Sequence, residues 1–133
     1  MRIFPTAALV LTLVILTATS AASAASIIGS WSGRGTVRLA SGQVEPISCR
    51  VRYENGGDSA GKTFVLNAKC AATGGTFLLY GRISKRSGNT YRGSLFNDQS
   101  RVSGKISISL GANSQRVRVN SSSGSGGITL RRR

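Results

Sequence analysis

The sequence predicts an all-β protein, a single small antiparallel up-and-down β-barrel of about eight strands. Three observations lead to this prediction. Apolar and polar residues alternate with a period of two along most of the chain, Gly is abundant with 17 residues against 2 Pro, and long helical periodicity is missing. Short clusters rich in Gly, Ser and Asn separate the alternating stretches, so consecutive strands should be antiparallel neighbours.

The first four predicted strands show the alternation most clearly. From Trp31 to Leu39 the odd positions are apolar or Gly, and the even positions are Ser, Thr or Arg. A strand of this kind buries one face and exposes the other. The same pattern predicts three further strands over residues 47–53, 64–70 and 77–83.

The second half of the chain repeats the pattern in mostly shorter stretches. Four more strands are predicted over residues 91–95, 102–110, 116–119 and 128–130. Sequential strands with one apolar face each close most simply into a barrel, because closure removes the exposed edges of an open sheet. A two-sheet β-sandwich is the alternative architecture.

The segment that precedes these strands has the features of a secretory signal peptide. One basic residue comes before an uncharged run over residues 7–19, and small side chains follow that run. We therefore predict cleavage after Ala24 or Ala25, which divides the chain into a signal peptide at 1–24 and a barrel domain at 25–133. An uncleaved N-terminal anchor is the alternative. We expect a periplasmic or secreted protein that does not span a membrane after cleavage.

The two cysteines fall on inward positions of adjacent predicted strands. Cys49 shares the apolar phase of Val51, and Cys70 shares that of Leu66. An exported protein meets an oxidising environment, in which an even number of cysteines forms bridges. We therefore predict a disulfide between Cys49 and Cys70, with two buried free thiols as the alternative.

Positive charge dominates the composition. The chain carries a net charge of +14, from 18 Lys and Arg against 4 Asp and Glu. In the predicted strands the basic residues fall on outward phases, so they should surround the barrel. Anionic envelope polymers or lipids are the expected partners, and a simply solvated basic surface is the alternative. Specific nucleic-acid binding is not expected, because Tyr80 and Phe96 are the only outward aromatic candidates.

The residue types that most catalysis requires are missing. The sequence has no His, so neither a Ser-His-Asp nor a Cys-His arrangement can form. Two widely spaced cysteines cannot complete a zinc site, and the four acidic residues look like turn or surface residues. We therefore expect a non-enzymatic protein with no catalytic residues, no metal and no cofactor.

The most specific local motif is GSWSGRG, over residues 29–35. It resembles the GxW opening of calycin barrels such as lipocalins and avidins, and its GxWxGxG extension is similar to the first strand of nitrobindin-like barrels. The resemblance implies that Trp31 closes one end of the barrel, with a basic residue late in the chain packed over it. Arg132 shares the inward phase of Leu130, so we expect it to stack on the Trp31 ring. The His that holds haem in nitrobindin-like proteins has no counterpart here.

Two functions follow from these features. In the first, the chain is an exported cell-envelope protein whose basic surface associates with anionic envelope components. In the second, it is a calycin-like carrier that holds a small apolar ligand among five aromatic rings. Those rings are Trp31, Tyr53, Phe64, Phe77 and Tyr91. The second function requires a cavity near the ~300 Å³ of small ligand sites, because five rings could simply fill so short a barrel.

Overall fold

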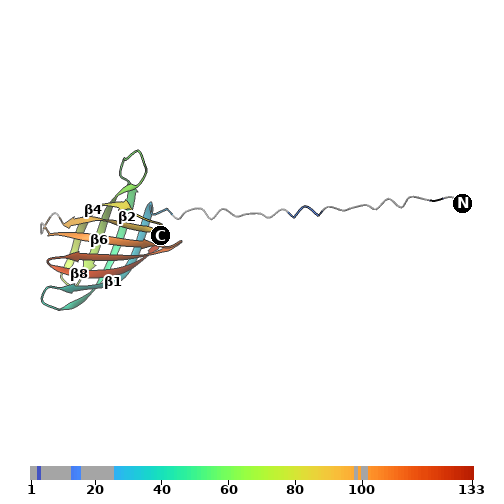
Figure 1. Cartoon of the computed structure of the whole chain (residues 1–133). Coiled ribbons are helices and arrows are strands. Elements are labelled where there is room, and N and C mark those ends of the chain that lie inside the picture. Colours follow the sequence, from blue (N-terminus) through green and yellow to red (C-terminus); the bar gives the residue numbers. More distant parts are fainter. Residues whose placement is uncertain (1–2, 4–12, 16–25, 98, 100–101) are drawn as a thin grey trace.

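A computed structural model describes residues 3, 13–15, 26–97, 99 and 102–133. The predicted signal-peptide cleavage site lies outside these residues. In the described part the chain forms a closed antiparallel barrel, in which each strand pairs with its neighbours in sequence and the last strand pairs with the first (Figure 1). The predicted up-and-down barrel is therefore confirmed, and the sheet does not split into a sandwich.

All strands except β6, which has the predicted bounds, are longer than the alternation alone predicted. Their bounds are β1 (Gly29–Leu39), β2 (Val44–Asn55), β3 (Thr63–Ala72), β4 (Gly75–Lys85), β5 (Thr90–Asn97), β6 (Val102–Leu110), β7 (Ser114–Ser121) and β8 (Gly124–Arg132). The largest difference is in β8, which begins four residues before Ile128. Those residues are Gly and Ser, so they carry no apolar phase, yet their backbones still pair with β1 and β7.

The inward phase predicted from the sequence is the buried phase of the barrel. In β2 the side chains of Ile47, Cys49, Val51 and Tyr53 are buried, and those between them are exposed. Cys49 lies directly opposite Cys70 in the β2–β3 register, and the two residues form a disulfide. The predicted disulfide is confirmed, and the free-thiol alternative is wrong.

Glycine allows the first and last strands to meet. Gly33 and Gly35 lie on β1 where it pairs with β8. A methyl group built on either would overlap a backbone carbonyl oxygen of β8, that of Thr129 or of Gly127. The two backbones are therefore too close for any other residue at these positions, and the sheet bends sharply enough to close.

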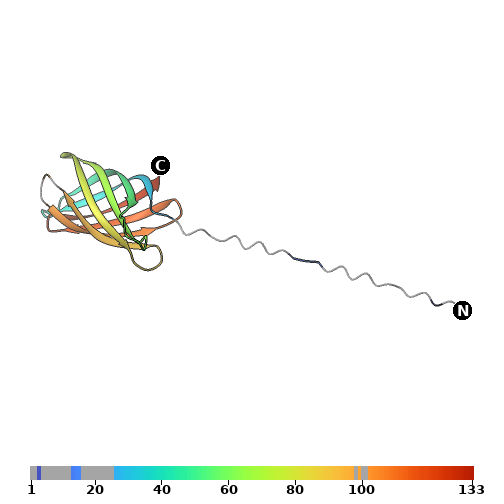
Figure 2. The same cartoon turned by 90° about the horizontal axis from the view of Figure 1, so that it is seen from above.

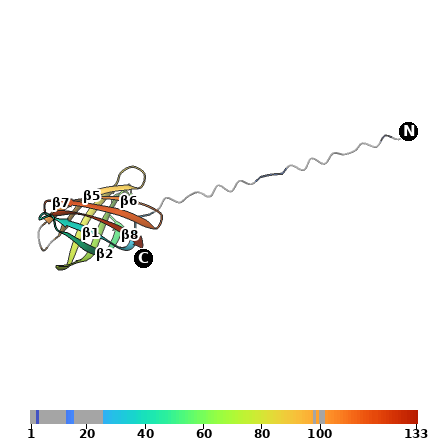
Figure 3. The ribbon, with the colours of Figure 1, turned by 90° about the horizontal axis from the view of Figure 1, so that it is seen from below.

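The strands run obliquely around the barrel, and their connections gather at its two ends (Figures 2 and 3). Because consecutive strands are antiparallel, β1 starts at the end where β2 finishes, and the same holds for each later pair. We call the end with the start of β1 the closed end and the opposite one the open end. Among the described residues, no helix is long and apolar enough to cross a membrane.

Candidate ligand-binding cavity

Trp31 and Arg132 lie together at one end of the barrel, where β1 starts and β8 ends. The Trp31 side chain is fully buried, and its indole N–H donates a hydrogen bond to the carbonyl oxygen of Ile27 at 2.9 Å. The guanidinium carbon of Arg132 lies 4.3 Å from the centre of the Trp31 ring, within the ~6 Å reach of a cation–π contact. Arg132 also donates to the carbonyl oxygens of Ile28, at 3.3 Å, and of Ser26. Residues 26–28 are thus held across the closed end.

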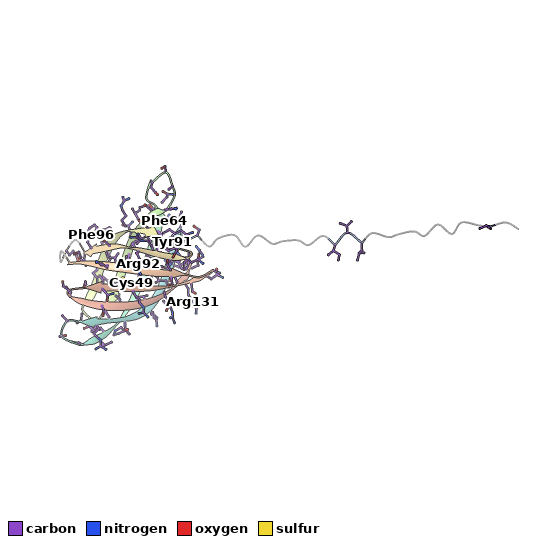
Figure 4. The ribbon with its side chains drawn as sticks, viewed as in Figure 1. Cys49, Phe64, Tyr91, Arg92, Phe96 and Arg131 are labelled. Carbon is purple, nitrogen blue, oxygen red and sulfur yellow. A yellow bond between two sulfur atoms is a disulfide. The ribbon has the colours of Figure 1, made fainter. Side chains whose placement is uncertain are left out.

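A second group of large side chains belongs to the same buried core as Trp31. The rings of Phe64 and Tyr91 meet edge to face, with centroids 5.7 Å apart and planes at 72°. Figure 4 shows both rings near the closed end, with Phe96 near the open end and Cys49 between them. Ile83 is fully buried and lies opposite Phe64 in the register. We call the packed side chains of this end the floor: Trp31, Phe64, Ile83 and Tyr91, together with the pair of Tyr53 and Gln115 described next.

The floor contains a polar pair that sequence reasoning missed. The Tyr53 hydroxyl donates a hydrogen bond to Oε1 of Gln115 at 2.7 Å, and both side chains are buried. The Nε2 atom of Gln115 has no hydrogen-bond partner within the described part of the chain. Burial raises the pKa of Tyr53 far above its ordinary value, so its hydroxyl keeps the proton that it donates. The sequence did contain one indication of this pair, because Gln115 lies two residues before Val117 and therefore has the same inward phase.

A cavity of about 560 Å³ lies between the floor and the open end. All eight strands contribute to its wall, and most of the wall is apolar. Among the side chains that line it are Val37, Leu66, Leu79, Leu95, Ile106 and Val119. Tyr53 and Leu130 also line the cavity and mark its deepest point, because both belong to the buried group at the closed end.

The five predicted ligand-lining rings divide between the floor and the cavity. Tyr53 and Phe77 line the cavity, whereas Trp31, Phe64 and Tyr91 pack in the floor and are not among the residues that line it. The phase of a residue says that it points inward but not how deep in the barrel it lies. The disulfide residues Cys49 and Cys70 also line the cavity wall.

The rim of the cavity is more polar than its wall. Hydroxyl groups come from Thr76, Ser121 and Ser123. Arg38 and Glu45 are the charged residues among those that line the cavity, and both lie at the rim. Inside the rim the wall carries no charge among the described residues, so a buried ionic group on a ligand would have no partner there.

The outer surface of the barrel carries the remaining charge. In the described part of the chain the one salt bridge joins Arg52 to Glu54 at 2.9 Å, between two exposed side chains. Arg50 lies directly opposite Lys69 in the β2–β3 register, an arrangement of like charges that does not stabilise a sheet. The outward rings of Tyr80 and Phe96 contact each other, with centroids 5.8 Å apart.

Comparison with known proteins gives a fold and no family. No family model matches the sequence, and no curated protein matches it. A de novo designed fluorescence-activating β-barrel is similar in structure, with a TM-score of 0.59 and 18% identity over 80% of this chain and 93% of that chain. The redesigned barrel mFAP1, solved bound to DFHBI, has a TM-score of 0.64 and 15% identity over 79% of this chain and 94% of that chain.

A further redesigned barrel has a TM-score of 0.61 and 14% identity, over 80% of this chain and 90% of that chain. At such identities the likeness concerns the fold alone. The calycin resemblance of the first strand is consistent with this fold, and no family match extends it. The described residues therefore form a small, closed, eight-stranded antiparallel barrel like those of designed barrels.

Proposed function

We propose that this protein is a non-enzymatic carrier that holds a small apolar ligand inside its barrel. The observation that supports the proposal most is the cavity of about 560 Å³ with an apolar wall, closed below by the floor. Ligand sites in proteins have volumes of roughly 300–1,000 Å³. A barrel with only a structural role gains stability by filling such a space, since dispersion contacts are lost wherever an apolar wall faces a void.

The lining supports an amphipathic ligand with its apolar part at depth. The deepest polar group in the wall is the Tyr53 hydroxyl, whose proton is already donated to Gln115. Polar side chains that a ligand could reach, such as Thr76 and Ser123, lie at the rim. A ligand with an apolar body and one uncharged polar end fits this arrangement. The barrel mFAP1, which has a similar fold, binds DFHBI, and this supports a ligand site in such a barrel.

A pair of matched variants tests the proposal. Ala68 points into the cavity from β3, and Ala71 points outward from the same strand. Ala68→Phe places a ring in the cavity and should weaken the binding of the uncharged dye Nile red about tenfold or more, whereas Ala71→Phe should leave it unchanged. Equal dye affinity in the two variants would show that the cavity isn't the binding site.

Native mass spectrometry of the protein from its own host would then identify the ligand. The proposal expects a mass adduct that the Ala68→Phe variant loses. Export remains a prediction, and the disulfide between Cys49 and Cys70 is compatible with the predicted periplasmic or secreted location. The N-terminal sequence of the same preparation tests the predicted cleavage after Ala24 or Ala25.

A further inference from the structure

The open end of the barrel exposes apolar side chains on two opposite sides of its rim. Leu39 and Val44 flank the β1–β2 turn and are 37% and 53% exposed, and Phe96, next to the end of β5, is 50% exposed. In a ring of eight strands β5 lies across from β1. The β1–β2 turn in Figure 1 and Phe96 in Figure 4 both lie at the left of the barrel. We call these three side chains the rim cluster.

Basic side chains from four of the strands lie at the rim or just behind it. Arg38 is the last residue but one of β1, and Lys69, Lys105 and Arg118 each lie three residues from the open end of β3, β6 and β7. At a rise of ~3.3 Å per residue the last three start roughly 10 Å from the rim, and their long side chains can reach towards it, whereas Arg38 lies at the rim itself. All four are exposed, and we call them the cationic ring.

The rim cluster, the cationic ring and the mouth of the cavity share one end of the molecule. Exposed apolar side chains in front of a belt of Lys and Arg are typical of proteins that insert shallowly into a bilayer, where apolar groups enter the acyl boundary and cations meet lipid phosphates. An apolar ligand also has low solubility in water, so its natural source is a membrane.

We propose that the open end docks on an anionic lipid bilayer, with the rim cluster among the headgroups and the cationic ring on lipid phosphates. An apolar ligand then passes between bilayer and cavity without entering water. The transfer step rests on the proposed carrier function, whereas the docking depends on the rim alone. A second copy of the chain is a poorer occupant of this surface, because two cationic rings would face each other on molecules of net charge +14.

Cosedimentation with vesicles tests the docking, using protein in the form that its host accumulates. We expect binding to vesicles of equal parts phosphatidylcholine and phosphatidylglycerol, weak binding to phosphatidylcholine alone, and release as salt rises. The combined variant Leu39→Ser with Val44→Ser should lower the partition coefficient about tenfold. Ile28→Ser is the matched control, because Ile28 is 43% exposed but precedes β1 at the closed end.

A second variant tests how much the cationic ring contributes to vesicle binding, and it leaves the rim cluster unchanged. Lys69→Gln with Lys105→Gln should weaken binding to the anionic vesicles severalfold and flatten its salt dependence. Docking is refuted if the unmodified protein ignores anionic vesicles, or if Ile28→Ser weakens binding as much as the rim variant does. It is also refuted if the rim substitutions alter only a concentration-dependent dimer, which would make the rim a contact between copies.

The cavity variant separates this proposal from the carrier function. Ala68→Phe should lose Nile red but keep its affinity for vesicles. Val44→Ser alone changes a rim residue that does not line the cavity, so it should keep Nile red and bind vesicles more weakly. In a transfer assay from dye-loaded anionic vesicles, both variants should be slow, for different reasons. If Ala68→Phe keeps the dye, the carrier function fails while vesicle binding still decides the docking.

Discussion

In both halves of the barrel every second side chain points inward, but these side chains pack together in one half and leave a cavity in the other. Near the closed end, large buried side chains pack together, and Trp31, Phe64 and Tyr91 do not line the cavity. Towards the open end, inward positions hold smaller residues, and a cavity of about 560 Å³ remains. The small residues of its lining include Ala68, Ala72, Gly104 and Gly126. The strand number is the same in both halves, so side-chain volume decides which half is filled.

The largest expected effect comes from opening the floor. Trp31→Ala should lower the free energy of unfolding by about 3 to 5 kcal/mol, because a fully buried ring is lost and the surrounding strands cannot collapse onto its place. Leu79→Ala in the cavity wall should cost roughly 1 kcal/mol, since Leu79 is only half-buried and faces the cavity. Urea unfolding measures both values, and equal costs would mean that the two halves are equally well packed in solution.

The polar pair of the floor gives the next largest effect. Tyr53→Phe leaves Gln115 with no partner for either of its polar atoms, and should cost about 1 to 3 kcal/mol. Replacing both members, with Tyr53→Phe and Gln115→Met, removes the unpaired groups and should restore most of that loss. A double-mutant cycle of unfolding free energies tests this, and strictly additive losses would contradict the pairing.

The smallest expected effect is a loss of stability in alkali that originates in the floor. Burial raises the pKa of Tyr53 and of Tyr91 above the ordinary value near 10. The folded state therefore keeps phenol protons that the unfolded chain releases. Their contribution is intact below about pH 10 and falls above it, and for Tyr53 the loss reaches at most about 1.4 kcal/mol by about pH 11.

Unfolding measured between about pH 9 and pH 11.5 checks this dependence. The double variant of Tyr53 and Gln115 should show a shallower decline than the unmodified protein, because one of the two phenols is gone. An identical decline in the two proteins would show that Tyr53 is not the source of the alkaline sensitivity.

The sequence predicted the architecture well and the cavity incompletely, for one physical reason. Alternation reports which face of a strand is buried, and this was enough for the strand order and the disulfide. It does not report depth, so Phe64 and Tyr91 were expected beside a ligand although they pack in the floor. In an up-and-down barrel, the starts of odd strands and the ends of even strands share one end. By that rule Trp31, Tyr53 and Gln115 belong together.

Other features have no signal in a residue pattern. The first residues of β8 are Gly and Ser, which pair with the neighbouring strands through their backbones. They show no alternation of apolar and polar side chains from which a strand could be predicted. The volume of the cavity depends on how inward side chains from all eight strands add up across the interior. The contact of Tyr53 with Gln115 joins residues 62 positions apart, so only the closed ring of strands reveals it.

The pairing of β1 with β8 has a consequence for how the chain reaches its fold. Every other pairing is a hairpin between consecutive strands, which forms locally, whereas this one joins the two ends of the domain. Closing so long a loop is entropically costly, so we expect the hairpins to assemble first and the ring to close last. Until then β1 and β8 are unpaired edges that another chain could join. Trp31 and Arg132 are paired across this last junction. Their contact therefore forms in the same step that removes the exposed strand edges and the risk of aggregation through them.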